Sequence, residues 1–86
     1  MSPIRGRQDG VIARWSGEEL LLLDTVADRI HQLNATAGLI WSKLEQGDSE
    51  ADIAQTLCNE FDVAAEQARA DVEATLRQFR EQGLLA

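Results

Sequence analysis

The chain has 86 residues, of which 44% are hydrophobic and 27% charged, and its formal net charge is −7. This composition is typical of a small soluble globular protein. The negative charge argues against nucleic-acid binding, because contacts to phosphates require a basic face. The longest purely apolar run, residues 20–23, is far shorter than the roughly 18 residues of a membrane-spanning helix, and the N-terminus lacks the apolar segment of a signal peptide. We therefore expect a cytoplasmic protein that binds neither nucleic acid nor membranes.

The residues that usually carry chemistry are scarce in this chain. It contains one cysteine, Cys58, and one histidine, His31, so it can form neither an internal disulfide nor a zinc-type ligand cluster. No Ser–His–Asp or Cys–His arrangement and no glycine-rich phosphate loop is present. We expect no catalytic residues, no metal, no cofactor and hence no enzyme.

The first third of the chain favours β-strands. Residues 1–9 are polar, contain Pro3 and Gly6, and are expected to form a flexible arm, whereas residues 10–86 are expected to form a single domain. Short strands are predicted at residues 11–15, 20–23 and 29–33, with turns at 16–19 and 24–28. Three strands joined by tight turns most simply form an antiparallel meander.

The remaining residues predict three helices. Asn34 is a good N-cap for the first, and Gly47 is a plausible stop. Ser49 caps the second helix, and the third runs from about residue 64 to residue 81 before Gly83. Apolar residues at helical spacing predict the buried faces, which comprise Leu33, Ala37, Ile40, Trp41 and Leu44 at the first helix, Ile53, Leu57 and Phe61 on the second, and Ala68, Val72, Leu76 and Phe79 on the third. Leu84 and Leu85 are expected to fold back onto the core.

Three segments carry a resemblance to a known family. "HQLNATAGLIW" (31–41), "LEQGDSEADIAQTL" (44–57) and "ADVEATLRQFREQGLL" (70–85) resemble, in order and spacing, the PqqD-like family, named after the coenzyme PQQ synthesis protein D. The resemblance covers about residues 10–85. It implies an α+β, winged-helix-like fold, a three-stranded antiparallel meander followed by three helices, that acts as a RiPP recognition element.

Such a module captures the leader of a ribosomally made precursor peptide by β-augmentation and presents it to a separate modifying enzyme. The approach to the first strand, "RQDGVIARW" (7–15), differs from that of the quinone-pathway proteins. The modifying enzyme is therefore left open among a radical SAM enzyme, a lasso-type protease or a similar partner.

The resemblance also implies where the peptide binds. Carried onto this chain, the docking edge is the third strand, which comprises Arg29, Ile30, His31, Gln32 and Leu33. The third helix would contribute the other wall of the groove, through Arg69, Val72, Glu73, Leu76 and Arg80. The opposite flank of that helix, with Asp71, Thr75 and Gln78, is the alternative; we favour the arginine-bearing row because it suits a leader with adjacent apolar and acidic residues.

Other interpretations of the same residues stay open. The last two helices resemble a helix-turn-helix, so a winged-helix DNA-binding regulator is an alternative, as is a non-catalytic structural subunit of a larger enzyme. An open sheet edge also permits a homodimer by strand exchange. His31 could be a half-exposed strand residue without a special role, and Trp15 could either pack under the helices or be exposed at a partner surface.

Overall fold

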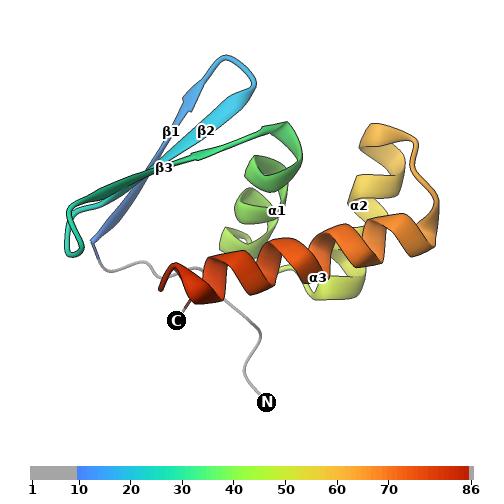
Figure 1. The fold of residues 1–86 in the computed structure, drawn as a ribbon. Helices are drawn as coiled ribbons and strands as arrows, with labels where there is room; N and C mark the ends of the chain where they lie inside the picture. The colour runs from blue at the N-terminus through green and yellow to red at the C-terminus, as the bar shows by residue number, and fades with distance from the viewer. Residues whose placement is uncertain (1–9, 86) are drawn as a thin grey trace.

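The computed structural model describes residues 10–85, so the flexible arm expected for residues 1–9 lies outside the described residues. Three strands, β1 (Val11–Ser16), β2 (Glu19–Asp24) and β3 (Arg29–Leu33), precede three helices, α1 (Ala35–Glu45), α2 (Glu50–Phe61) and α3 (Ala65–Glu81). The strands form an antiparallel sheet in the order β1-β2-β3, and the helices pack on one side of it (Figure 1). The predicted α+β fold, a meander followed by three helices, is confirmed.

The central strand β2 gives the sheet its two faces. Successive side chains of a strand point to opposite faces, so Leu20 and Leu22 turn toward the helices and are buried, whereas Leu21 and Leu23 lie on the outer face. Two turns set the register. Gly17 has a positive φ of 63° between β1 and β2, and the buried Asp24 accepts hydrogen bonds on Oδ1 from the amides of Val26 and Ala27 in the β2–β3 turn.

The helices begin and end at the capping residues that the sequence predicted. The side chain of Asn34 accepts a hydrogen bond from the amide of Ala37 at 2.9 Å, and that of Ser49 accepts one from Asp52 at 3.2 Å. Gly47, with φ 85°, lies just beyond the end of α1. Because Asn34 follows β3 directly, the strand runs into a capped helix without a loop.

The core lies where the three helices meet the inner face of the sheet. Trp41 of α1 and Phe79 of α3 meet edge to face, with ring centroids 5.4 Å apart and ring planes at 88°. The amide of Leu84 donates to the carbonyl of Phe79, which turns the chain back after α3 and buries the Leu84 side chain, while Leu85 packs against the core from its margin. The predicted fold-back of the last residues is confirmed.

One predicted core position is wrong. Phe61 was expected on the buried face of α2, but it is 40% exposed. It is the last residue of α2, and the following residue, Asp62, adopts a left-handed conformation that turns the chain away toward α3. The core of α2 therefore ends one turn earlier, at Leu57.

No described helix is long and apolar enough to cross a membrane.

Candidate functional site

The open edge of β3 is the first element of the candidate site. Because β2 is the central strand, β3 has a neighbouring strand on one side only among residues 10–85, and the backbone groups on its other side face away from the sheet. Its five residues are paired with residues 20–24 of β2, from Leu20 opposite Leu33 to Asp24 opposite Arg29. An extended segment could add to this edge through main-chain hydrogen bonds.

The side chains of β3 divide between the two faces of the sheet. Arg29, His31 and Leu33 lie on the helix side, since they are paired with Asp24, Leu22 and Leu20, all of which are buried. Ile30 and Gln32 lie on the outer face and are exposed, Ile30 to 69%. Leu33 is only 8% exposed and belongs to the core, so of its groups only the backbone is placed to meet a peptide. The side chain of His31 is half-buried, so its burial is intermediate between that of the exposed Arg29 and that of the buried Leu33.

A groove of about 320 Å³ continues from the end of β3 between α1 and α3. It is lined by Asn34, Thr36 and Ala37 from the start of α1, and by Asp71, Ala74, Thr75 and Gln78 from α3. Asn34 is the residue that directly follows β3, so the open edge and the groove are continuous along the chain. The lining is polar and carries one acid and no cation.

The arginine-bearing row of α3 lies on the other flank. Arg69 and Glu73 share a groove with Glu50 and Ala51 of α2, and Arg80 lines an adjoining groove that again includes Glu50 and Glu73. This row therefore faces α2, because the two helices pack side by side, and the row with Asp71, Thr75 and Gln78 is the one that lies beside the end of β3. We therefore propose that a peptide on β3 meets the row with Asp71, Thr75 and Gln78 rather than the arginine-bearing row.

Two further predicted contact residues, Val72 and Leu76, are buried in the core, although each also reaches the floor of a groove next to α2. Their side chains hold α3 against the rest of the domain. The sequence pattern contained this information, since both residues belong to the apolar stripe of α3 that was expected to face inward.

Helix α3 stands apart from the sheet. Among the described residues, the backbone of α1 approaches both β2 and β3, whereas the backbone of α3 approaches none of the strands. Helix α1 follows β3 through a single residue, and α3 crosses in front of α1 in Figure 1.

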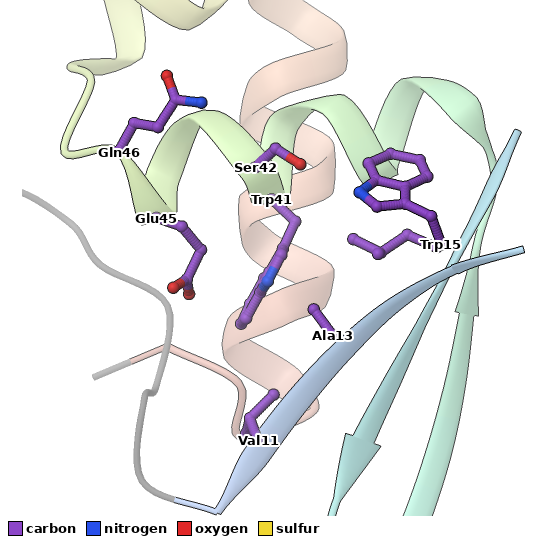
Figure 2. A pocket seen from close by; sticks show the side chains of 8 residues that line it. Val11, Ala13, Trp15, Trp41, Ser42, Glu45 and Gln46 are labelled. Atoms are coloured by element: carbon purple, nitrogen blue, oxygen red, sulfur yellow. The ribbon is translucent and has the colours of Figure 1, made fainter.

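The opposite edge of the sheet, β1, also borders a groove, of about 310 Å³ (Figure 2). Its lining includes Val11, Ala13 and Trp15 of β1 and Trp41 and Glu45 of α1. Trp15 is 55% exposed, yet its ring contacts α1: a Cβ atom built on Gly38 would lie 2.9 Å from Cη2 of Trp15. Both interpretations of Trp15 therefore hold in part, since the indole packs on a helix and remains accessible.

Gly38 is a residue that sequence reasoning missed. A glycine within an otherwise helical pattern signals a close approach of another segment, and this signal was present between Ala37 and Leu39.

The remaining chemistry of the described residues is sparse. They contain no group of three or more His, Cys, Asp or Glu side chains that could hold a metal ion. Cys58 is a free, half-buried cysteine that packs against the core. On α3, Arg77 and Arg80 lie in a groove with Glu50 and Glu73, so this helix presents mixed charges rather than a basic face for DNA.

Comparisons with known proteins agree with this architecture. The sequence model of the family described as Coenzyme PQQ synthesis protein D (PqqD) matches residues 19–85. A solved structure described as lasso peptide synthetase B1 complexed with the leader peptide superposes with a TM-score of 0.88, at 32% sequence identity and with 99% of both chains covered. TbiB1 in complex with the TbiA(beta) leader peptide gives a TM-score of 0.84 at 27% identity, covering 99% of this chain and 94% of that one. No curated protein sequence is significantly similar to this chain.

Proposed function

This chain belongs to the family of coenzyme PQQ synthesis protein D, and we propose that it is a RiPP recognition element that binds the leader segment of a ribosomally made precursor peptide. The observation that carries the proposal is the near-complete superposition, at 32% identity, on a lasso peptide synthetase B1 chain solved with its leader peptide. The open edge of β3 supplies a physical means of binding.

The leader adds to β3 as a fourth strand. Each main-chain hydrogen bond contributes a net free energy of about 0.5–1.5 kcal/mol, which offsets part of the entropy lost when the peptide becomes ordered. Such bonds set the register but do not distinguish one sequence from another, because every residue has the same backbone. The amino-acid sequence of the leader must therefore be recognised through contacts between side chains.

Recognition falls to the groove between the β3–α1 junction and α3. Its walls carry the amide or hydroxyl groups of Asn34, Thr36, Thr75 and Gln78, together with the carboxylate of Asp71. This lining suits polar or basic leader side chains and disfavours an acidic one, which would lie beside Asp71 without a cation to compensate it. Of the residues expected from sequence, Arg29, Ile30, His31, Gln32 and Leu33 keep their proposed role as the docking edge.

The bound leader is presented to a separate modifying enzyme in the cytoplasm, and the domain itself is not an enzyme. The similarity to a lasso peptide synthetase B1 chain supports a lasso-type pathway, with a lasso-type protease as the receiving enzyme, over a radical SAM pathway. We also propose that residues 10–86 fold as a single unit, since the buried residues from β2 to Leu84 form one continuous core.

Binding of a fluorescent leader tests the proposal. The probe is the synthetic leader of a candidate precursor peptide, sought among the short reading frames next to the gene for this chain. It is labelled at its N-terminus and titrated with the full chain while anisotropy is followed. We expect saturable binding that an unlabelled leader reverses, and much weaker binding of a scrambled leader of the same composition. Equal binding of the two peptides, or none, would contradict the proposed function.

The same open edge permits two copies of the chain to pair by strand exchange. Such a homodimer would occupy the edge that the leader requires. Its mass in light scattering should therefore fall to that of a monomer–peptide complex when the leader is added; a dimer that persists at saturation would show that the copies meet elsewhere.

A further inference from the structure

The edge strand β1 is uncovered on the side that faces the helices. Val11, Ala13 and Trp15 lie on that side, since Trp15 is paired with the buried Leu20 and successive side chains of a strand alternate. Yet Ala13 and Trp15 are both exposed, Trp15 to 55%. The reason is the position of α1, whose backbone approaches β2 and β3 but not β1 within the described chain. The groove of about 310 Å³ between β1 and α1 is therefore open beside the edge of the sheet.

Strand β1 also lacks the features that commonly protect an edge strand. Natural proteins prevent unwanted pairing by placing a proline, a bulge or an inward-pointing charge on such a strand. Residues 11–16 contain no proline, pair with β2 without a break in register, and carry their only charge, Arg14, on the outer face. Among residues 10–85, β2 is the only strand next to β1. A further extended segment can therefore pair with its free backbone groups and direct alternate side chains to the groove.

The groove combines an apolar floor with one carboxylate. The buried Leu20 and Trp41 form the floor, and the accessible indole of Trp15 forms a wall. Glu45 is the last residue of α1 and is exposed, and its side chain projects from α1 on the same side as that of Trp41 (Figure 2).

No cation compensates this carboxylate among the described residues that line the groove. Lys43 of the same helix donates to Oε1 of Gln46 at 3.5 Å, but it is not part of the lining. The carboxyl end of a helix favours positive charge, and an indole binds both apolar groups and cations. The groove thus fits an extended segment with an apolar side chain for the floor and a Lys or Arg side chain for Glu45.

A second copy of the chain does not supply this chemistry. Two copies that pair antiparallel through β1 form one continuous sheet, in which each side chain keeps its face. Arg14 of the second copy would then lie on the outer face, away from Glu45. Each copy also carries a net charge of −7, which opposes their association.

We propose that β1 and its groove dock the enzyme that receives the leader, through an extended segment of that enzyme with an apolar and a basic side chain. The identity of this partner rests on the proposed function, because presentation requires that the domain hold leader and enzyme together. The inference adds a second interface, on the edge of the sheet opposite to β3. Leader and enzyme then bind at the same time, and neither displaces the other.

The test measures the binding of both partners to the same variants. The probes are the synthetic leader and a purified candidate lasso-type protease, each sought among the reading frames next to the gene for this chain. Ala13→Glu places an inward-pointing carboxylate in the groove, and Glu45→Lys reverses the charge there. We expect the dissociation constant of the protease to rise more than about tenfold for Ala13→Glu and about three- to tenfold for Glu45→Lys, while that of the leader stays within about twofold.

Glu60→Lys is the matched control. It changes the net charge by the same amount as Glu45→Lys and also lies in the last turn of its helix, but on α2, away from the groove. It should leave both dissociation constants within about twofold. The melting temperatures of all three variants should stay within about 4 °C of wild type, since the three positions are exposed.

Four results would overturn the inference while leader binding stands. They are unchanged protease affinity in both Ala13→Glu and Glu45→Lys, an equal loss in Glu60→Lys, competition between leader and protease for the wild-type chain, and no binding of the protease to it. Light scattering tests the other occupant: a wild-type dimer that Ala13→Glu converts to a monomer would show that a second copy fills the groove. A wild-type chain that binds the protease but not the leader would instead contradict the proposed function.

Discussion

Gly38 shows how one missing side chain fixes the distance between two elements. It is buried in α1, and a Cβ atom placed on it would lie 2.9 Å from the ring of Trp15 and 3.1 Å from Cβ of Leu20. Both distances are shorter than a carbon–carbon contact of about 3.5–4.0 Å. The sheet can therefore approach α1 this closely only because residue 38 is glycine.

We predict that Gly38→Ala lowers the stability of the domain. Alanine favours a helix over glycine by about 1 kcal/mol, but overpacking a well-filled core costs about 1–3 kcal/mol, so the clash should win. A net loss of about 1 kcal/mol would lower the melting temperature by about 4–8 °C in a domain of this size. Thermal unfolding followed by circular dichroism measures the effect.

The control for this prediction is the same substitution in a Trp15→Ala background. There the ring contact is gone and only the Leu20 contact remains, so Gly38→Ala should cost less than it does in the wild-type chain. A higher melting temperature for Gly38→Ala alone would contradict the prediction. It would mean that the gain in helix propensity exceeds the cost of the clash with Trp15 and Leu20.

Residues whose role is set by local chemistry could be predicted from the sequence. Asn34 and Ser49 cap helices because their side chains reach amides three residues further on, a relation that needs no knowledge of the fold. Phe61 could not be placed in this way. It continues the apolar spacing of α2, and only the left-handed turn at Asp62 shows that the helix ends before anything covers it.

Helix α3 illustrates what could be predicted for an element. The 3.6-residue period identified its buried stripe, Ala68, Val72, Leu76 and Phe79, because burial imposes that period on the sequence. The two flanks of the stripe carry no comparable signal. Which flank lies beside β3 depends on the direction in which α3 crosses α1 and α2, a tertiary property that no local pattern encodes, and for this reason the sequence led us to favour the arginine-bearing row.

The two flanks of α3 predict opposite outcomes for leader binding. Thr75→Arg places a long side chain in the groove beside the end of β3, where Thr75 is half-buried, and should weaken leader binding by more than about tenfold, or 1.4 kcal/mol. Arg80→Ala, on the flank that faces α2, should change the affinity by less than about twofold. Isothermal titration calorimetry with the synthetic leader measures both.

Melting temperatures of the two free variants provide the control, since both positions lie outside the core. A loss of affinity for Arg80→Ala with no loss for Thr75→Arg, at unchanged melting temperatures, would restore the arginine-bearing row as the wall of the peptide groove.

As a whole, the molecule is a thin domain whose described strands leave both edges of the sheet, β1 and β3, without a further strand. Within the part of the chain that the structure describes, 14 buried hydrophobic residues form the core, and no described segment covers exposed residues such as Ile12 and Ile30 on the outer face of the sheet. Small domains bury a modest share of their surface and are correspondingly marginal in stability. The strand pattern in the sequence indicated three strands and their order, and the family resemblance added the prediction that the third strand is the docking edge. In the structure β1 and β3 each border a groove, so that assignment stays a prediction.

We predict that the leader stabilises the whole domain by mass action. A ligand at 100 times its dissociation constant contributes about 2.7 kcal/mol. At about 4–8 °C per kcal/mol, the melting temperature should rise by at least about 10 °C. Scanning fluorimetry on the two tryptophans, Trp15 and Trp41, reports the transition. A scrambled leader at the same concentration is the control, and an equal shift with both peptides would indicate nonspecific stabilisation.

From the net charge of −7 we predict that the protein does not bind DNA. Duplex DNA should show no binding in anisotropy titrations even at low ionic strength, where attraction to phosphates is strongest. Binding that weakens linearly with the logarithm of salt concentration would instead support a winged-helix regulator.

The most direct test of peptide addition at β3 is backbone amide hydrogen exchange, resolved residue by residue by NMR, with and without the leader. An added strand pairs with the amides on the open side of β3, so exchange of these amides within residues 29–33 should slow most, while the amides on the unpaired side of β1, residues 11–16, which exchange without unfolding, keep their rates. Slower exchange in β1 with no change in β3 would contradict the account, because it would place the peptide on the opposite edge of the sheet.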